Sequence, residues 1–227
     1  MSATDVPVVA LRSASRWFRA SAGPVIAVDA VSLEIRAGEA VGLAGPSGSG
    51  KTTLLNLIVG WEQPDAGTIE RGVDLAGGWT SVAVVPQELG LVPELTAAQN
   101  VELAARLGHG SAWSVDELFA ALDLVGLADR LPDELSVGEQ QRTAVARAVI
   151  CAPQFLVADE PTAHQDERHA DQVMDVLAAT AARGGALLVA THDDRVLARV
   201  DRVLDLLDGR LTTGGDSGGA GHPEPRR

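Results

Sequence analysis

A glycine-rich run at residues 45–53 has the residue types and spacing of a phosphate-binding loop. The run reads GPSGSGKTT and matches the pattern G-x-x-x-x-G-K-[ST]. Glycines let the backbone turn several N–H groups toward one anion, Lys51 supplies a positive charge, and the Thr52 hydroxyl can ligate Mg²⁺. An ordinary glycine-rich turn is the alternative, but the apolar run before it and the helical pattern after it favour the phosphate loop. The residues expected to bind phosphate are Gly45, Ser47, Gly48, Ser49, Gly50, Lys51, Thr52 and Thr53.

Two adjacent carboxylates follow a second apolar run. Residues 155–158 end directly at Asp159 and Glu160, and the carboxyl end of a buried strand is where ligands bind in open α/β sheets. Asp159 can therefore hold Mg²⁺, directly or through water, and Glu160 can orient and deprotonate an attacking water. A plain turn before Pro161 would have the same residues, so the interpretation as a reactive pair depends on the phosphate loop upstream.

A third segment carries the most specific pattern of the chain. Residues 135–142 read LSVGEQQR, which resembles the signature motif of the ATP-binding cassette (ABC) ATPases, usually LSGGQ followed by QQR. With that match, the resemblance extends from Val8 to about Leu211 and keeps the family's motif order of P-loop, glutamine, signature, Asp-Glu and histidine. The resemblance implies an enzyme that hydrolyses ATP. It further implies that ATP is held between the P-loop of one subunit and the signature of the other in a head-to-tail homodimer.

The signature also has a physical basis in the sequence. Ser136 precedes a helical run that starts at Val137. Its hydroxyl, the Gly138 amide and the helix N-terminus can form a second anion site, with Glu139 in the same turn. Two positions depart from the family pattern, because Val137 stands for Gly and Glu139 for Gln. These changes put a β-branched side chain and a negative charge near the phosphate of the opposite subunit.

The resemblance assigns roles to further residues. Gln87 would contact Mg²⁺ or the attacking water, and His192 would bind the γ-phosphate and help to hold Glu160; an ordinary loop or surface residue is the alternative for each. Phe18 would stack on adenine, unless it or the adjacent Trp17 belongs to the core. The D-loop, which contacts the partner subunit, reads AHQD at residues 163–166 instead of the common SALD. The implied catalytic residues are Glu160 and His192, the implied ligands of Mg²⁺ are Thr52, Gln87 and Asp159, and the further nucleotide contacts are Phe18, Gln87, Ser136, Gly138, Glu139 and Asp166.

The elements that must position these residues follow an α/β pattern. Strands are predicted at 8–18 and 25–35, separated by a break at Gly23-Pro24, and at 40–44, 68–70, 81–85, 155–158 and 186–190, with a hairpin formed by 203–207 and 210–211. Helices are predicted after the P-loop, over 97–107 between Thr96 and Gly108 or Gly110, from Ser114 to Leu124 with a stop at Gly126, and over 137–150 and 166–182.

The predicted fold class is an α/β P-loop NTPase with a RecA-like core, an N-terminal antiparallel β subdomain and an inserted α-helical subdomain. The ABC ATPase domain is expected at residues 1–212, with the β and RecA-like core at 8–90 and 151–212 and the helical subdomain with the signature at 91–150. Residues 213–227 are rich in Gly, Pro and Ser and are expected to form a disordered tail.

The composition limits the class of protein. A formal net charge of −13 without a basic stripe argues against a nucleic-acid partner. The single Cys151 excludes an internal disulfide and is expected to be a small buried side chain in the helix before Pro153. No apolar run reaches the roughly 18 residues of a membrane span, and residues 1–6 lack the features of a secretion signal. We therefore expect a cytoplasmic protein that is peripheral on the inner face of the cell membrane through a partner.

Three further runs resemble one group of cassettes. VGL before and LLN after the P-loop, residues 95–101 and residues 191–195 are similar to the lipoprotein-releasing, macrolide-export and heterocyst-glycolipid exporters. This implies ATP and Mg²⁺ as ligands, a homodimer, and a separate integral-membrane permease of the exporter or mechanotransmission type for lipid, lipoprotein or peptide cargo. The permease would dock near residues 87–96, on Leu89, Leu91, Val92 and Leu95, unless these side chains pack the insert. The alternatives are a regulatory or scaffold ABC ATPase of cell-division type and a soluble ABC ATPase outside transport.

Overall fold

The strands form two sheets, and the P-loop follows a strand of the larger one. The computed structural model describes residues 7–21, 23–72, 81–108 and 113–212. In this part of the chain, a three-stranded antiparallel sheet has the order β2-β1-β4 and a six-stranded sheet has the order β5-β6-β7-β3-β8-β9. The first sheet consists of β1 (Val9–Ala20), β2 (Gly23–Ile35) and β4 (Ala66–Arg71). The second consists of β3 (Ala40–Ala44), β5 (Val82–Val85), β6 (Phe155–Asp159), β7 (Ala186–Ala190), β8 (Arg202–Leu207) and β9 (Arg210–Thr212).

The six-stranded sheet brings several strand ends to one edge. Its neighbours β5, β6, β7, β3 and β8 pair in parallel, and β9 returns antiparallel to β8, which confirms the predicted hairpin. Because carboxyl ends of parallel strands lie on the same edge, Ala44, Asp159 and Ala190 end side by side. The P-loop, which follows Ala44, therefore starts at the edge where β6 presents its acidic residues.

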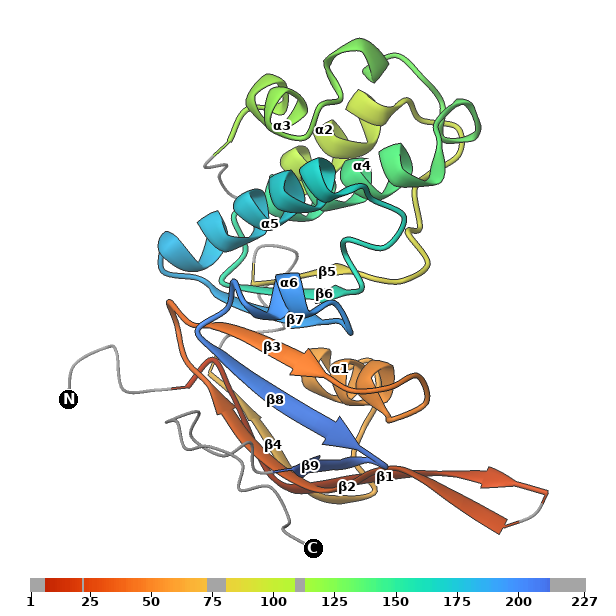
Figure 1. Cartoon of the computed structure of the whole chain (residues 1–227), viewed down its shortest axis with the longest axis vertical. Helices are drawn as coiled ribbons and strands as arrows, with labels where there is room; N and C mark the ends of the chain where they lie inside the picture. Colours follow the sequence, from red (N-terminus) through yellow and green to blue (C-terminus); the bar gives the residue numbers. More distant parts are fainter. Residues whose placement is uncertain (1–6, 22, 73–80, 109–112, 213–227) are drawn as a thin grey trace, which may run out of the picture.

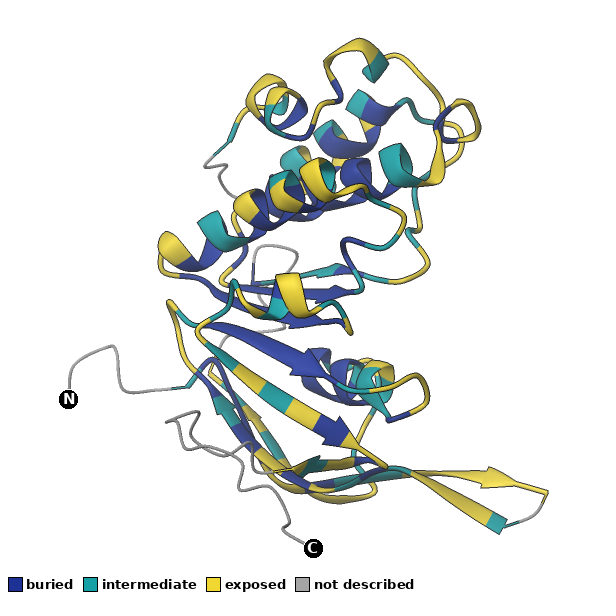
Figure 2. Ribbon diagram, in the orientation of Figure 1, coloured by how far each residue is buried: buried dark blue, intermediate teal, exposed yellow. Residues whose placement is uncertain are grey.

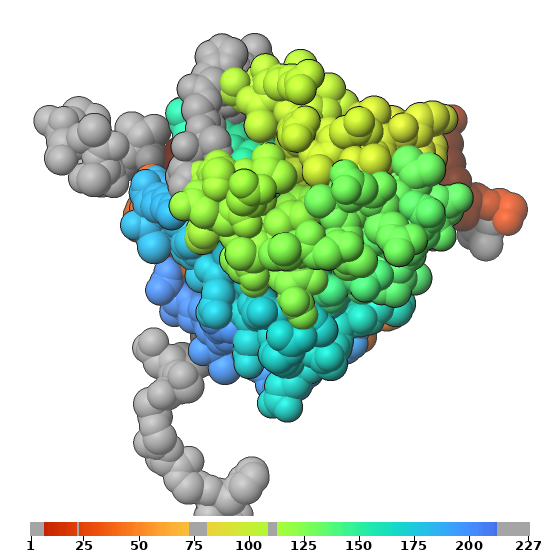
Figure 3. All heavy atoms as spheres, turned by 90° about the horizontal axis from the view of Figure 1, so that it is seen from above, coloured from red at the N-terminus to blue at the C-terminus, as the bar shows by residue number. Residues whose placement is uncertain are grey.

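The helices occupy distinct positions around the six-stranded sheet. Figure 1 shows α2, α3 and α4 at one end of the molecule and the three-stranded sheet at the other, with the six-stranded sheet between them. Seen from above, the yellow-to-green residues of α2, α3 and the segment that follows them cover this end, and α5 lies beside them (Figure 3). No helix within the described ranges is long and apolar enough to cross a membrane. The helices are α1 (Lys51–Val59), α2 (Ala97–Leu107), α3 (Val115–Ala121), α4 (Val137–Val149), α5 (Glu167–Ala182) and α6 (Asp194–Leu197), with 3-10 turns η2 (Val125–Leu127) and η3 (Pro132–Glu134).

The central strands β3, β6 and β7 of the six-stranded sheet are buried on both faces (Figure 2). Along β6, Phe155 and Val157 join a core cluster with α1, β1 and β2, whereas Leu156 and Ala158 join the cluster formed with α2 to α5. Successive side chains of a strand point to opposite faces, so a continuous apolar run is the pattern of a strand covered on both sides. The apolar runs that predicted β3, β6 and β7 are explained by this double cover.

The helix predicted from Ser114 to Leu124 is shorter than expected. α3 ends at Ala121, because Asp123 adopts a φ of 55°, which an α-helix cannot contain. The predicted stop at Gly126 lies inside the 3-10 turn η2 and was wrong. The expected ends of α2 are confirmed, since Thr96 caps it through a capping box and Gly108 follows its last residue.

The break predicted at Gly23-Pro24 was also wrong. Both residues lie within β2, where Gly23 pairs with Ala20 and Pro24 with Arg19. β2 is an edge strand, so the missing N–H of Pro24 can be tolerated there. The helix α6 and the turn η3 were not predicted. The predictions for Gly110 and for the tail at 213–227 lie outside the described residues.

Candidate functional site

The P-loop is held between β2 and the β8–β9 hairpin, and glycine is required at both contacts. A Cβ on Gly50 would lie 2.1 Å from the Ala27 carbonyl oxygen, and one on Gly45 would lie 2.3 Å from the Leu206 carbonyl oxygen. Gly50 also has a φ of 103°, which side chains disfavour. The loop is supported further where Gly209 N donates to the Ser49 carbonyl at 2.9 Å. These contacts fix the loop against the two sheets.

Lys51 closes over this loop. Its Nζ donates to the Gly45 carbonyl at 2.7 Å and to the Pro46 carbonyl at 3.3 Å. Gly48 has a φ of 80°, and a Cβ there would meet no atom within 4 Å. The loop therefore has a glycine backbone next to open space and an ammonium group bound to its first two carbonyls, the combination expected of an anion site.

Asp159 and Thr52 form the second part of the site. The Thr52 hydroxyl donates to Asp159 Oδ2 at 2.8 Å, and Asp159 is buried. Burial raises the pKa of Asp159, the Thr52 hydrogen bond opposes this, and the nearby Glu160 charge adds to it. A hollow of about 250 Å³ is lined by Thr52, Gln87 and Asp159 together with Trp61. All three predicted Mg²⁺ ligands thus line one hollow, and oxygen donors of this kind suit that hard cation.

Every polar group of Glu160 has a hydrogen-bond partner. Its N–H donates to the Ala190 carbonyl at 2.8 Å, and its own carbonyl accepts from Gln141 Nε2 at 2.7 Å. Its carboxylate accepts from the Thr191 hydroxyl at 3.0 Å, and His192 Nδ1 lies 2.8 Å from the other carboxylate oxygen. Its φ of 49° is unusual for a residue with a side chain. The two predicted catalytic residues, Glu160 and His192, are therefore in contact.

The predicted second anion site lies at the start of α4. The Ser136 hydroxyl accepts from Glu139 N at 3.3 Å, while Glu139 Oε2 accepts from Ser136 N at 2.7 Å. This capping box holds the pKa of Glu139 below its usual range, chiefly through the backbone N–H of Ser136. The Glu139 carboxylate, whose charge was expected near a phosphate, thus accepts a hydrogen bond at the start of its own helix. Val137 is exposed beside it.

The structure does not bring the signature to the P-loop of the same chain. Across the described ranges, no recorded hydrogen bond or ion pair joins Ser136, Gly138 or Glu139 to residues 45–53. Phe18 lies on the outer part of β1, beneath the Arg16 guanidinium at 4.8 Å from its ring centre. Asp166 caps α5 by accepting from His169 N at 2.9 Å. These predicted residues form separate surfaces within one chain.

Two expectations about apolar side chains have different outcomes. Trp17 and Phe18 are each about 40% exposed, so neither ring belongs to the core, contrary to the alternative that assigned one of them there. Cys151 is buried as predicted, but it follows the end of α4 rather than lying in it. Burial raises the pKa of its thiol.

Several polar residues that support the site were not predicted. Thr191 and Gln141 both bind Glu160. The buried Asn100 accepts from Val92 N and donates to three carbonyls, and Arg147 donates to the carbonyls of Leu89 and Gly90. These two side chains fold the segment after Gln87 onto the helices, where Leu89, Leu91, Val92 and Leu95 are half-buried. A polar residue on an otherwise apolar helix face was the signal that could have identified Asn100.

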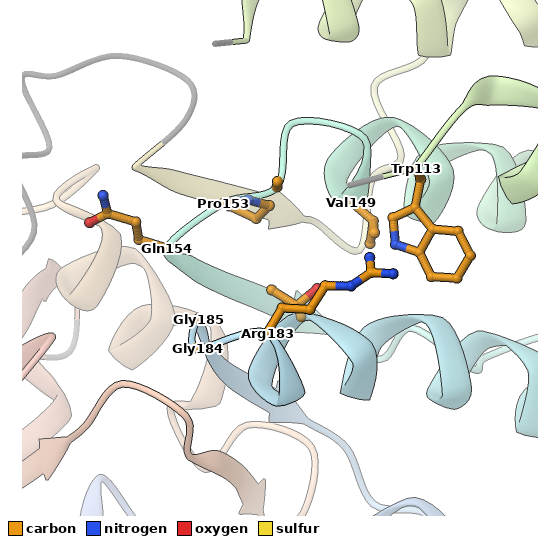
Figure 4. Close-up of a pocket in the computed structure, with 9 residues that line it drawn as sticks. Trp113, Val149, Pro153, Gln154, Arg183, Gly184 and Gly185 are labelled. Atoms are coloured by element: carbon orange, nitrogen blue, oxygen red, sulfur yellow. The ribbon is translucent and has the colours of Figure 1, made fainter. Parts of the chain in front are cut away.

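A second hollow lies apart from these groups. It has a volume of about 290 Å³, and Figure 4 shows Arg183 pointing toward Trp113 across it. The guanidinium lies 4.6 Å from the ring centre, a cation–π distance. Its lining contains no predicted site residue.

The family of the chain follows from comparison with known proteins. The family model described as ABC transporter matches residues 28–163, more than half of the chain. This chain belongs to the ABC transporter family. The predicted ABC-type ATPase and the predicted fold are both confirmed, since solved ATP-binding cassettes share the architecture.

Relatives of this ABC protein include subunits of export systems. The lipoprotein-releasing system ATP-binding protein LolD of Novosphingobium aromaticivorans is 42% identical over 221 residues, covering 90% of this chain and 98% of the relative. The macrolide export ATP-binding/permease protein MacB of Burkholderia thailandensis is 34% identical over 219 residues, covering 90% of this chain but 34% of that protein. A dimeric ATP-binding cassette solved in a post-hydrolysis state with ADP and Pi has a TM-score of 0.81 and 31% identity, covering 89% of this chain and 96% of that chain.

Proposed function

We propose that this chain is the ATP-binding and ATP-hydrolysing subunit of a transporter, and that two copies close around two ATP molecules to drive a separate permease. The observation that carries the proposal is the arrangement at the end of β6. There Asp159 contacts Thr52 of the P-loop, and Glu160 contacts Thr191 and His192. A nucleotide bound to the P-loop would have its terminal phosphate next to these groups.

The P-loop would bind the phosphates through its backbone N–H groups and the first turn of α1. Lys51 would exchange the carbonyls of Gly45 and Pro46 for phosphate oxygens, which are stronger acceptors because they are charged. Ser47, Ser49 and Thr53 supply hydroxyls in the same loop. Phe18 would stack on adenine from the outer part of β1, since its ring is exposed and stacking needs only a π-face.

Thr52, Asp159 and Gln87 would hold Mg²⁺, because they line one hollow beside the P-loop. Bound there, the ion would supply positive charge that offsets the negative charge of the nucleotide phosphates. The raised pKa of Asp159 fits this role, since burial disfavours its charge until a cation is present.

Glu160 would accept a proton from the water that attacks the γ-phosphate. Its carboxylate is positioned by the Thr191 hydroxyl and by His192, while its backbone is held by Gln141 and Ala190. His192 is largely exposed, so its ring remains accessible to a nucleotide phosphate. Positioning of this kind lowers the barrier because the base does not have to reorganise during the reaction.

The start of α4 would complete the site of the other subunit. Among the described residues, Ser136, Gly138 and Glu139 make no hydrogen bond or ion pair with residues 45–53 of their own chain, and we assign them, with the D-loop ending at Asp166, to the nucleotide of a second copy. The dimeric state of the cassette solved with ADP and Pi supports this proposal.

The permease partner, the cargo and the domain division belong to the same proposal. We assign lipids, lipoproteins or peptides as the cargo class, supported by the name of the lipoprotein-releasing relative; the macrolide-export relative supports export, but not this cargo class. The chain would then work at the inner face of the membrane through the permease, with docking near residues 87–96. The proposed core comprises residues 8–90 and 151–212, and the proposed helical subdomain comprises 91–150.

The test uses the purified chain and Glu160→Gln. The wild type should hydrolyse Mg·ATP, whereas Glu160→Gln should lose turnover and form an ATP-dependent dimer on size-exclusion chromatography with light scattering. Glu70→Gln, an exposed change on β4, is the matched control and should behave as the wild type. Turnover retained in Glu160→Gln, or a variant that stays monomeric with ATP, would contradict the proposal. Co-purification of a permease from solubilised membranes tests the transport role.

A further inference from the structure

One side chain ties the D-loop to the signature helix. Gln165 Oε1 accepts from Arg142 Nη1 at 2.8 Å, and Gln165 Nε2 donates to the Gly138 carbonyl at 2.8 Å. Both partners lie in the first two turns of α4, whereas Gln165 lies in the segment between β6 and α5. One amide therefore uses both of its ends to hold the D-loop against α4.

The backbone packs closely at the same point. A Cβ on Gly138 would lie 3.0 Å from the His164 carbonyl oxygen and 3.2 Å from Gln165 Nε2. His164 has a φ of 61°, and Gln165 N donates to the Thr162 carbonyl at 3.2 Å. The D-loop is thus a tight turn that rests directly on the helix at Gly138, and the Gln165 side chain is the polar part of that contact.

Arg142 makes this contact energetically important. It is 6% exposed, and burial lowers the pKa of its guanidinium. Among the described residues, its Nε is buried without a hydrogen-bond partner, so Gln165 supplies a partner that the buried charge needs. A hydrogen bond to a charged donor is stronger than one between neutral groups.

A second contact anchors the opposite end of the same segment. Gln141, adjacent to Arg142, donates to the Glu160 carbonyl at 2.7 Å. Residues 160–166 are therefore attached to α4 at Glu160 through Gln141 and at Gln165 through Arg142 and Gly138. These hydrogen bonds link Glu160 to the start of α4.

We propose that Gln165 is a positioning residue, which fixes the start of α4 relative to Glu160 so that the Ser136 hydroxyl and the Gly138 amide meet the γ-phosphate of ATP in the partner subunit. The proposal rests on the proposed function, in which these groups face the partner. Its consequence is that each half-site transmits its state to the other. Glu160, which would lie beside the ATP of its own subunit, is linked through residues 160–166 to the helix that would face the opposite nucleotide.

The central test is Gln165→Met in the full chain, since Met keeps the length of the side chain and removes both hydrogen bonds. Binding of a fluorescent ATP analogue to the monomer should change less than about twofold, because the P-loop is untouched. In the Glu160→Gln background, the ATP-dependent dimer should weaken by about tenfold or more, the scale of one lost charge-assisted bond. In the otherwise wild-type chain, the kcat and the Hill coefficient of ATP hydrolysis should both fall, while the affinity of the monomer for the ATP analogue should stay the same.

Two further variants separate positioning from folding. Gln165→Glu keeps an acceptor for Arg142 but opposes the Gly138 carbonyl, so it should melt near the wild-type temperature and still weaken the dimer. Gln172→Met, a matched change within α5, should leave dimerisation unaltered. If Gln165→Met lowers only the melting temperature, with dimerisation and kcat unchanged where both proteins are folded, the proposal is wrong. A wild type without turnover or an ATP-dependent dimer would instead overturn the proposed function.

Discussion

Gln141 Nε2 donates to the backbone carbonyl of Glu160 at 2.7 Å, which joins the signature helix to the residue proposed as the base. Glu160 has a φ of 49°, and a left-handed conformation costs roughly 1–2 kcal/mol in a residue with a side chain. Within the described residues, Gln141 Oε1 is buried without a partner, so the donor end is what the side chain contributes. The strained backbone that aims the carboxylate is thus maintained from α4.

Gln141→Met removes this donor and keeps the shape of the side chain. We expect a loss of about 1 kcal/mol in the free energy of unfolding, the net value of one hydrogen bond. We also expect kcat to fall several-fold with little change in KM for ATP, because the P-loop is intact. Steady-state ATPase assays and chemical denaturation measure both effects. Gln154→Met, at an exposed position away from the site, is the control, and an equal loss of kcat there would show that the effect is not specific.

Asp159→Asn should stabilise the protein in the absence of nucleotide. Burial raises the folded-state pKa of Asp159 above its unfolded value, so its ionised form destabilises the fold at neutral pH. That penalty is fully present above the folded pKa and is relieved as the pH falls through it toward the ordinary value. The melting temperature should therefore rise in Asp159→Asn at pH 7–8, and the gain should shrink as the pH is lowered toward about 4.

The same variant should respond weakly to Mg·ATP, since it lacks the charge that would hold the cation. Asn can still accept from Thr52, so the fold keeps that contact. Thermal melts at several pH values, with and without Mg·ATP, provide the measurement. A lower melting temperature without nucleotide would contradict the expected sign.

Glu139→Gln tests whether the negative charge of the Glu139 carboxylate weakens the ATP-dependent dimer. Gln can replace Glu in a capping box, so α4 should keep its start and lose only a few tenths of a kcal/mol from the missing charge at the helix N-terminus. Removal of the negative charge should strengthen the ATP-dependent dimer in the Glu160→Gln background, and more so at low salt. Glu117→Gln makes the same change in the capping box of α3 and should leave dimerisation alone. Equal effects of the two changes would argue against a charge near the phosphate.

Phe18→Leu should weaken ATP binding to the monomer. Loss of aromatic–base stacking is worth about 1–3 kcal/mol, or roughly five-fold to a hundred-fold in Kd. Trp17→Leu is the control, because neighbouring side chains of a strand point to opposite faces and Trp17 is equally exposed. Titration with a fluorescent ATP analogue measures both. A larger effect of Trp17→Leu would transfer the stacking role to that ring.

The apolar runs and glycine spacing allowed most of the fold to be predicted, since β3, β6 and β7 are buried on both faces and the P-loop glycines meet backbone oxygens. The end of α3 escaped prediction because a left-handed Asp123, and not a glycine, terminates it. The continuation of β2 through Pro24 depends on its being an edge strand, which is a property of the sheet and not of the local sequence.

The site residues that we propose to contact a ligand were predicted, whereas those that contact other protein groups were missed. The predicted residues belong to motifs that can be read directly from the sequence: Lys51, Asp159, Glu160 and His192. Thr191, Gln141 and Gln165 act through contacts between segments 19 to 31 residues apart, and no local pattern records which of many polar residues will meet there.

The P-loop rests on backbone atoms from both early and late parts of the chain: Ala27 against Gly50, Leu206 against Gly45 and Gly209 bonded to Ser49. During synthesis, the ribosome releases the lysine-bearing turn long before residues 206–209 exist. At that stage the nascent chain carries the complete motif without the contacts of Leu206 and Gly209, so we expect it to bind a triphosphate weakly until the final hairpin has been made and has packed against the loop.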